Sequence, residues 1–283
     1  MLPTIRIEDG VEDLLSKSMR GLGMTATSLA AKVGLREGVV SGALEGRVDP
    51  QTLDKLAQAL SLDNSSLREL CKPCEGPEIE LPCGLIMLNT AHPVPGYAEM
   101  TVNSYLLFSA INTTNAIAFD TGSDPAIHDK ILSEQNRKLR QLFLTHTHRD
   151  HVAAYDALFH SRLEVFACKR EPFEGATLLG AGEHFELAEF SIKALETRGH
   201  SPGGTSYLIE GLDRLVVIVG DALFCRSIGT IPAGLYEQAL RQIEATILTL
   251  PGETILCPGH GPPSTVSFEK AHNPFFAGRF SSD

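Results

Sequence analysis

The chain has 283 residues, of which 43% are hydrophobic and 21% are charged. This balance is ordinary for a globular protein with a sizeable core. Its formal net charge of -11 at pH 7 argues against a general attraction to nucleic acid or to anionic membranes. The first residues lack the cationic start and apolar run of a signal peptide, and no apolar stretch is long enough to cross a bilayer. We therefore expect a cytoplasmic protein with no membrane partner.

Cysteine usage fits the same compartment, because six cysteines without an export signal favour a reducing environment over a disulfide framework. Three scattered cysteines are expected to be buried: Cys168, Cys225 and Cys257. Cys71 and Cys74 form a C-x-x-C pair with Cys83 nearby. This group is either a redox pair or part of a metal site, or a set of linker residues, and no fourth ligand is evident.

Residues 1–70 are predicted to form a small all-helical domain. The spacing of Val11, Leu14 and Leu15 predicts a first helix. A second helix is expected over residues 29–33, capped by Thr27 or Ser28, and three more are expected over residues 36–44, 50–60 and 66–70. Pro50 suits the first turn of the fourth of these helices.

Residues 28–34 and 40–46, followed by Pro50, resemble the helix-turn-helix domain of phage-repressor-like regulators. The resemblance implies DNA as a partner. Residues 1–74, however, contain nine Lys or Arg and ten Asp or Glu, a local net charge of -1, whereas cationic groups drive phosphate contact. The expected recognition helix also offers Gly and Val where base-reading side chains would be Arg, Asn or Gln. Two interpretations stay open, an operator-binding domain and a dimerisation or vestigial domain.

Residues 71–83, rich in Pro, Gly and Glu, are predicted to be a linker. The pattern then changes to short apolar runs typical of β strands. Nine strands are expected, over residues 85–88, 104–108, 116–119, 142–144, 164–167, 190–194, 206–209, 215–219 and 255–257. Helices are expected between them over residues 124–134, 152–159 and 235–250. Residues 84–283 are therefore predicted to form a second, α/β domain.

The densest group of potential metal ligands follows the apolar run 142–144, in the segment Thr145-His146-Thr147-His148-Arg149-Asp150-His151. Alternate side chains of an extended segment lie on the same side, so His146 and His148 can approach one cation. Asp150 and His151 then face a second position. Imidazole suits zinc, iron and similar ions, and carboxylate adds charge. Four such side chains in H-x-H-x-D-H order predict a metal centre, whereas a lone histidine would indicate a structural role.

This segment resembles the metal-binding motif of the metallo-β-lactamase superfamily, and later segments match the superfamily's other motifs in order. They are the segments that contain Asp120 (Phe-Asp-Thr-Gly), His200 (Arg-Gly-His-Ser-Pro-Gly), Asp221 (Val-Gly-Asp) and His260 (Pro-Gly-His-Gly). The resemblance covers residues 84–283. It implies an αββα sandwich, preceded here by the small helical domain.

The resemblance also implies a dinuclear site. It assigns as ligands His146, His148 and His200 for the first ion, Asp150, His151 and His260 for the second, and Asp221 for both. Asp150 is in addition the candidate catalytic residue, and Asp120 is expected to orient a ligand histidine through its free ring nitrogen. We expect two divalent ions, zinc first, with iron or manganese as alternatives. The other histidines lack a motif and are expected to be structural: His92, His128, His160, His184 and His272.

Residues 220–229 look most like the glyoxalase II-like branch of the superfamily. That branch commonly continues with Arg-Thr-Asp where this chain has Thr230-Ile231-Pro232, and the glutathione-holding helical extension of glyoxalase II is missing after residue 276. We therefore predict a metal-dependent hydrolase of a small thioester, lactone or related ester that handles glutathione thioesters poorly. The alternatives are a mononuclear iron persulfide dioxygenase and a DNA-binding regulator with a ligand-sensing metal domain. A homo-oligomer is compatible with each.

Overall fold

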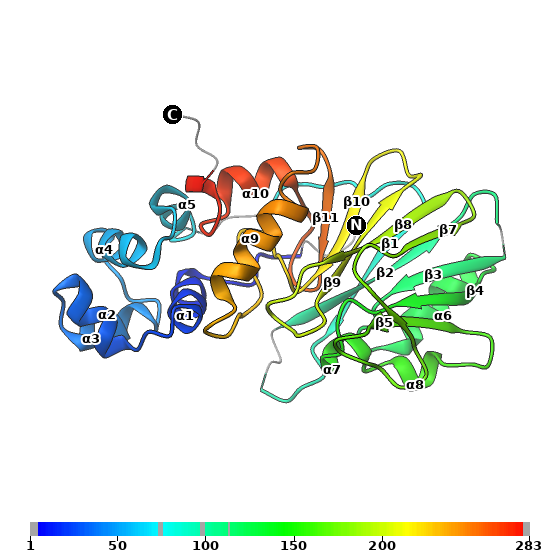
Figure 1. Cartoon of the computed structure of the whole chain (residues 1–283), viewed down its shortest axis with the longest axis horizontal. Helices are drawn as coiled ribbons and strands as arrows, with labels where there is room; N and C mark the ends of the chain where they lie inside the picture. Colours follow the sequence, from blue (N-terminus) through cyan, green and yellow to red (C-terminus); the bar gives the residue numbers. More distant parts are fainter. Residues whose placement is uncertain (1–4, 73–75, 97–99, 113, 280–283) are drawn as a thin grey trace.

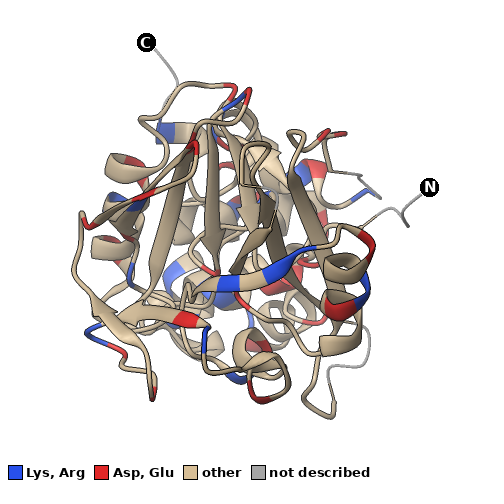
Figure 2. Cartoon of the chain, turned by 90° about the vertical axis from the view of Figure 1, so that its right-hand side faces the viewer, with Lys and Arg blue, Asp and Glu red and all other residues tan. Residues whose placement is uncertain are grey.

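The computed structural model describes residues 5–72, 76–96, 100–112 and 114–279. Within them, a group of short helices comes first and a two-sheet sandwich follows (Figure 1). No helix in these ranges combines the length and the apolar content needed to span a bilayer. Charged residues of both signs are interspersed over the end of the sandwich that lies away from the N-terminal group of helices (Figure 2).

The helices expected before residue 71 are present. They are α1 (Val11–Gly21), α2 (Ala26–Val33), α3 (Glu37–Ala43), α4 (Pro50–Leu60) and α5 (Asn64–Glu69). The Thr25 side chain caps α2 by accepting from the backbone of Ser28, and Gly34 ends it with a φ of +67°. Asp49 caps α4, whose first residue is Pro50. Local capping therefore explains both ends of α2 and the start of α4.

The first sheet has the order β1-β2-β3-β4-β5-β6. Its strands are β1 (Leu85–Ala91), β2 (Thr101–Phe108), β3 (Asn115–Phe119), β4 (Lys138–Phe143), β5 (Glu164–Cys168) and β6 (Thr177–Leu179). The pairs from β3 to β6 are parallel, and β1-β2 and β2-β3 are antiparallel. Helix α6 (Pro125–Glu134) connects β3 to β4, so the carboxyl ends of these strands lie at one edge.

The second sheet has the order β12-β11-β10-β9-β8-β7. Its strands are β7 (His184–Leu187), β8 (Phe190–Glu196), β9 (Thr205–Glu210), β10 (Val216–Gly220), β11 (Ile255–Pro258) and β12 (Ser264–Thr265). Helix α9 (Tyr236–Thr246) connects the parallel pair β10 and β11. Helix α10 (Val266–His272) and the short 3-10 helix η1 (Ala277–Arg279) follow β12.

A core rich in aromatic rings fills the space between the two sheets. Phe143 on β4 packs edge-on against Tyr207 on β9, with ring centroids 5.3 Å apart, and stacks on Phe119 of β3 at 5.6 Å. Helices α6, α7 (Arg149–Val152) and α8 (Tyr155–Leu158) belong to the first sheet's side, and α9 lies on the other side (Figure 1). The predicted αββα sandwich is confirmed.

Several local predictions differ from the structure. The helix expected over residues 152–159 is divided into α7 and α8 at Ala153 and Ala154. Strands β6, β7 and β12 and helix α10 were missed. Strands β6 and β7 are short and mostly outside the core, with Leu179 as the buried residue of β6, so they lack the apolar run that marks the central strands.

The helical region, residues 5–70, packs directly onto the sandwich. Leu14 and Leu15 of α1 share one apolar core with Tyr236 and Leu240 of α9. The Cα of Gly21 comes so close to Tyr236 that a Cβ would lie 2.2 Å from the ring carbon Cδ2. Figure 1 shows α1 and α5 beside α9 and α10. The helices before residue 71 therefore do not stand apart from the rest of the chain.

A buried arginine adds polar contacts to this interface. Arg226 donates from Nη2 to the carbonyl oxygen of Ser66 at 3.0 Å and to Glu69 at 2.6 Å. Its backbone nitrogen donates to the buried Glu269 carboxylate at 3.0 Å. Burial raises the pKa of Glu269 to about 7, against the lowering effect of hydrogen bonds from Ser264 and Asn273. Arg226 thus connects α5 to the loop that follows Asp221.

The cysteine predictions have mixed outcomes. Cys225 and Cys257 are buried as expected, whereas Cys168 is half-buried. Cys71 and Cys83 are exposed. Cys74 lies outside the described residues, so the redox or metal interpretation of the C-x-x-C pair stays a prediction.

Candidate metal centre

The structure brings the seven predicted ligands together at one edge of the sandwich. They are His146, His148, Asp150, His151, His200, Asp221 and His260. His146 and His148 lie in the loop after β4. Asp150 and His151 lie on α7, which begins at Arg149, before the helix expected from residue 152. His200 lies between β8 and β9, while Asp221 directly follows β10. Strands held in two sheets thereby fix the starting points of all these loops.

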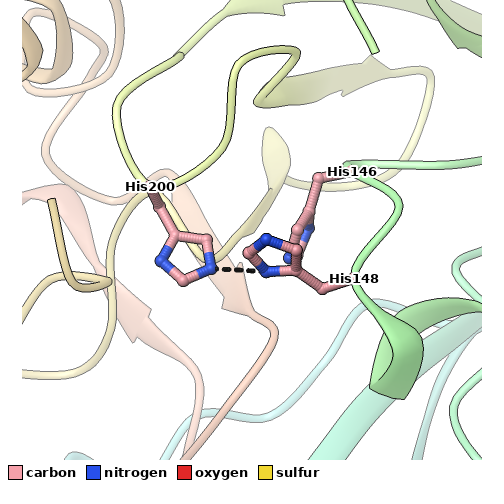
Figure 3. A group of neighbouring side chains, drawn as sticks. All are labelled: His146, His148 and His200. Carbon is pink, nitrogen blue, oxygen red and sulfur yellow. Dashed lines mark hydrogen bonds between the residues drawn. The ribbon is translucent and has the colours of Figure 1, made fainter. Parts of the chain in front are cut away.

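His146, His148 and His200 form the first group. One ring nitrogen from each lies within 4.8 Å of the others, and the three rings converge from two separate loops (Figure 3). His200 Nε2 is 2.9 Å from His148 Nδ1. His146 is buried, His200 is half-buried and His148 is exposed, so this group is open to solvent on one side.

Asp150, His151 and His260 form the second group, with ligand atoms again within 4.8 Å of one another. Asp150 Oδ2 lies 3.2 Å from His260 Nε2 and 3.5 Å from His151 Nε2. All three side chains are buried. A carboxylate and two imidazoles at these separations are a suitable donor set for a divalent ion.

Asp221 lies between the two groups. Its Oδ1 is 3.2 Å from His151 Nε2, and its Oδ2 is 3.3 Å from His200 Nε2. The same Oδ2 lies 3.5 Å from His260 Nε2 and 4.0 Å from His146 Nε2. One carboxylate therefore faces histidines of both groups, which is the position a bridging ligand needs.

Three buried atoms at the middle of this cluster have no hydrogen-bond partner among the described residues: His146 Nε2, His151 Nε2 and Asp221 Oδ1. Leaving such an atom unsatisfied costs about 1–3 kcal/mol, and native proteins rarely place several together. All three belong to side chains of ligand type and face the same space. The residues present therefore fit a metal centre.

Four of the histidines are held by hydrogen bonds at Nδ1, which leaves Nε2 directed at the centre. His200 donates from Nδ1 to the carbonyl oxygen of Thr230 at 3.1 Å, and His260 donates to that of Thr101 at 2.6 Å. His146 Nδ1 is 3.0 Å from the Thr145 hydroxyl, and His151 Nδ1 is 2.8 Å from Asp120 Oδ2. Fixing the tautomer in this way is typical of metal-binding histidines.

Asp120 connects two of these histidines. It follows β3 with a φ of +55°, in the left-handed region that costs a non-glycine residue some backbone energy. Its carboxylate accepts from His151 Nδ1 and from both the backbone nitrogen and the hydroxyl of Thr145, at 2.8 and 2.7 Å. Thr145 in turn contacts His146. Asp120 therefore lies where its predicted orienting role requires.

The protonation of the cluster follows from burial and from the carboxylates. Burial lowers the pKa of His146 well below its usual value, and the neighbouring His151 lowers it further, so its ring is neutral. Burial raises the pKa of Asp221, but His260 and His151 outweigh that effect and hold it well below its usual range. Burial also lowers the pKa of His151, yet Asp221 and Asp120 prevail and raise it to about 10. A cation at this position would displace that proton.

The chain is also similar to known proteins. The family model described as Metallo-beta-lactamase superfamily matches residues 98–260, more than half of the chain. The chain belongs to the metallo-β-lactamase superfamily. The matched range contains Asp120 and all seven predicted ligands. The helices before residue 71 lie outside it, so their helix-turn-helix identity stays a prediction.

Relatives within the superfamily carry hydrolase names. The chain is 30% identical over 200 residues to the probable metallo-hydrolase YqgX from Bacillus subtilis, covering 62% of this chain and 92% of the relative. It is 30% identical over 186 residues to the hydroxyacylglutathione hydrolase GloC from Haemophilus influenzae, covering 57% and 87%. The solved BLEG-1 B3 metallo-β-lactamase aligns with a TM-score of 0.55 at 27% identity, covering 67% of this chain and 99% of that one.

Two further side chains lie near the centre, and the sequence did not predict their place there. His92, expected to be structural, has Nε2 3.4 Å from Asp150 Oδ2. Glu171 accepts from the backbone and the hydroxyl of Thr147, at 2.8 and 2.7 Å, and from the backbone nitrogen of Gly203 at 2.8 Å. It thereby joins the two loops that carry the first group. The one available signal was its place just beyond β5, at the same edge of the sheet from which the loop after β4 leaves.

The other four histidines expected to be structural lie outside the two ligand groups. His128 is buried, with Nε2 2.8 Å from the Thr121 carbonyl oxygen, and burial lowers its pKa. His160 contacts the Leu139 carbonyl oxygen at 3.0 Å. The remaining two contact side chains elsewhere: His184 at Ser191 and His272 at Glu69.

A cleft of about 1030 Å³ leads to the metal centre. Its floor includes His148, Asp150 and His200. Its lining also includes residues 5–9, Asp13 and Lys17, from the N-terminal part of the chain. A volume of this size is at the upper end of the range found for small-molecule sites.

Proposed function

We propose that this chain is a dinuclear metallohydrolase that cleaves a small thioester, lactone or related ester. The single observation that carries the proposal is the pair of ligand groups that share Asp221 at the floor of a substrate-sized cleft. His146, His148 and His200 would hold one ion, and Asp150, His151 and His260 the other. Zinc is the first candidate, because imidazole and carboxylate donors in such sets suit it.

The side chains around the site have distinct roles in this proposal. When bound, two divalent ions supply Lewis acidity that polarises the substrate carbonyl and lowers the pKa of a water. Asp120, Thr145 and the backbone carbonyls described above keep the histidine Nε2 atoms in place. Asp150 lines the cleft and is the candidate catalytic residue, placed to orient the attacking water. Its pKa is lowered by His260 and His151 against the effect of burial, so it is a carboxylate at neutral pH.

The cleft offers little positive charge to hold the carboxylates of a glutathione thioester. Of the two basic residues that line it from the N-terminal part of the chain, Lys17 forms an ion pair with Asp9. The other basic residue, Arg6, is exposed, and the acidic Glu8 and Asp13 line the same cleft. Glutathione carries two carboxylates far from its thioester, and losing remote contacts reduces transition-state stabilisation. We expect lactoylglutathione to be hydrolysed with kcat/KM below about 10⁶ M⁻¹s⁻¹, and a higher value would contradict this specificity.

The function is tested by elemental analysis of the purified full chain together with assays on a panel of thioesters and lactones. We expect two ions per chain and hydrolysis of at least one panel member, abolished by a chelator and restored by zinc. One iron per chain with oxygen consumption on a persulfide, and no hydrolysis, would instead support the mononuclear dioxygenase alternative.

DNA binding by the helical region stays a prediction of weak affinity. Helix α3, the expected recognition helix, exposes Glu37 and Gly38 and buries Val40 and Ala43. An acidic and a small residue offer no favourable contact to phosphate or to base edges. Full-length protein should bind duplex DNA with a Kd of about 10⁻⁶ M or weaker at physiological salt. Nanomolar, sequence-selective binding would support the regulator alternative.

A further inference from the structure

The segment Ile5–Asp9, which precedes α1, reaches the second ligand group of the metal centre. Glu8 is its central contact. The Glu8 Oε1 atom accepts from the backbone nitrogen of Thr101 at 3.1 Å and from the Thr101 hydroxyl at 3.0 Å. The carbonyl oxygen of the same Thr101 receives the Nδ1 hydrogen bond of His260 at 2.6 Å. Glu8 therefore holds the residue that fixes the His260 ring.

The second carboxylate oxygen of Glu8 faces His260 itself. Glu8 Oε2 lies 3.7 Å from His260 Nδ1. It is a buried atom without a hydrogen-bond partner in the described part of the chain. On the opposite side of the ring, His260 Nε2 points at Asp150 and Asp221. The imidazole thus lies between the Glu8 carboxylate and the space assigned to the second ion.

Helix α1 supports this arrangement from a second direction. Lys17 pairs with Asp9 and donates to the Ile228 carbonyl oxygen at 2.8 Å. Its Nζ also lies 4.9 Å from the centroid of the Phe224 ring. Phe224 packs edge-on against His260, with ring centroids 5.4 Å apart. The N-terminal part of the chain consequently approaches His260 both through Glu8 and, by way of Lys17, through Phe224.

We propose that Glu8 is a positioning residue for His260, and that residues 5–9 form a built-in part of the active site. This inference rests on the dinuclear function proposed above. A carboxylate behind a metal-binding imidazole fixes the ring orientation and increases the basicity of the nitrogen that faces the ion. Glu8 supplies this carboxylate from a segment outside the matched family range of residues 98–260. The N-terminal part of the chain is then needed to keep His260 correctly oriented toward the second metal position.

The test measures metal affinity by competition with a chromogenic chelator in full-length protein. The variants are Glu8→Ala and Glu8→Gln, with Glu12→Gln as the matched control. Glu12 lies on α1 and is absent from the cleft wall. Loss of an outer contact of a metal ligand typically lowers affinity 10–100-fold. We expect E8A to weaken one of the two ions by roughly tenfold and to leave the other unchanged. E8Q, which keeps an oxygen for Thr101, should have a smaller effect, and E12Q none.

A second measurement does not depend on how many ions bind. Nitrogen-15 NMR of the histidine rings, with the His260 signal assigned by its loss in His260→Ala, reports the ring's hydrogen bonding in metal-free and metal-loaded protein. The His260 signal should shift in E8A and stay in place in E12Q. An unchanged His260 signal and unchanged affinities in folded E8A and E8Q would overturn the role of Glu8. Binding of one ion by the wild type, with the E8A shift still present, would instead overturn the dinuclear function alone.

Discussion

The two ligand groups differ in exposure and in how they are supported. The first group opens to solvent through His148, and Glu171 joins the two loops that carry it. The second group is more buried, although Asp150 and His260 also line the cleft, and it is held by Asp120 behind His151 and by Thr101 and Glu8 behind His260. Burial removes competing water and strengthens charge interactions. We infer that the second position is the more rigid, and that the first is the side from which substrate approaches.

The largest effect is expected from Asp221→Ala, because Asp221 faces both groups. Without its carboxylate, the four histidines around it lose their shared negative neighbour, and neither ion keeps a complete set of ligands. We expect loss of both ions and a fall in activity on the order of 10³-fold or more. Elemental analysis and steady-state assays measure the two effects. Retention of two ions by D221A would break the bridging assignment.

Replacing one histidine of each group tests whether the two positions are separable. His200→Ala should remove the ion of the first group, and His260→Ala the ion of the second, leaving about one ion per chain in each case. The residual ion should be bound more tightly in H200A, because the second group is buried and more fully supported. Metal content after dialysis measures this difference. Equal affinities in the two variants would show that burial does not distinguish the positions.

Asp120→Asn tests the support that reaches both groups. Asp120 holds His151 directly and His146 through Thr145, so its charge and geometry affect one ligand of each position. We expect affinity to fall about 10–100-fold at both positions. Asp129→Asn, an exposed residue of α6, is the control and should behave as wild type. A loss confined to one position would show that the link through Thr145 is not needed.

The smallest effect is expected from Glu171→Gln. The glutamine keeps one carbonyl oxygen, which can accept from Thr147 or from Gly203 but no longer from both loops. Position 171 contacts none of the candidate metal ligands directly. Affinity at the first position should fall severalfold, because Glu171 acts through Thr147 and Gly203 and not on a ligand itself, and the second position should not change. Chelator competition detects this. A change at the second position would argue that the two groups share their supporting loops.

The candidate ligands that the structure brings together could be predicted from the sequence because most of them lie in contiguous motifs. His146 to His151 carry the pattern within six positions, and Asp221 and His260 lie in short glycine-containing segments that match the same superfamily. The central strands were predictable for a related reason, since β2 and β10 are apolar along most of their length. The elements that escaped detection, β6 and β7, are mostly outside the core and have no such run.

Contacts between distant segments could not be predicted in the same way. Glu8 and Thr101 are 93 residues apart, and nothing in the N-terminal residues distinguishes Glu8 from Asp9 or Glu12. His92 was expected to be structural because the histidine carries no motif, yet it faces Asp150. The apolar residues of α1 have the same spacing whether they pack against the other N-terminal helices or against Tyr236 of α9. The sequence therefore does not show which surface they cover. These features depend on tertiary packing, which periodicity does not encode.

The close contact between Gly21 and Tyr236 limits which N-terminal helices could be joined to this sandwich by recombination. Any other residue at position 21 would place its Cβ inside the volume of the Tyr236 ring, so the two positions must change together. Transfer of residues 1–70 onto a hydrolase without a matching α9 face would leave α1 without the surface that it contacts here. The helical region therefore cannot be exchanged independently of α9. A change in one of the two packing surfaces requires a matching change in the other.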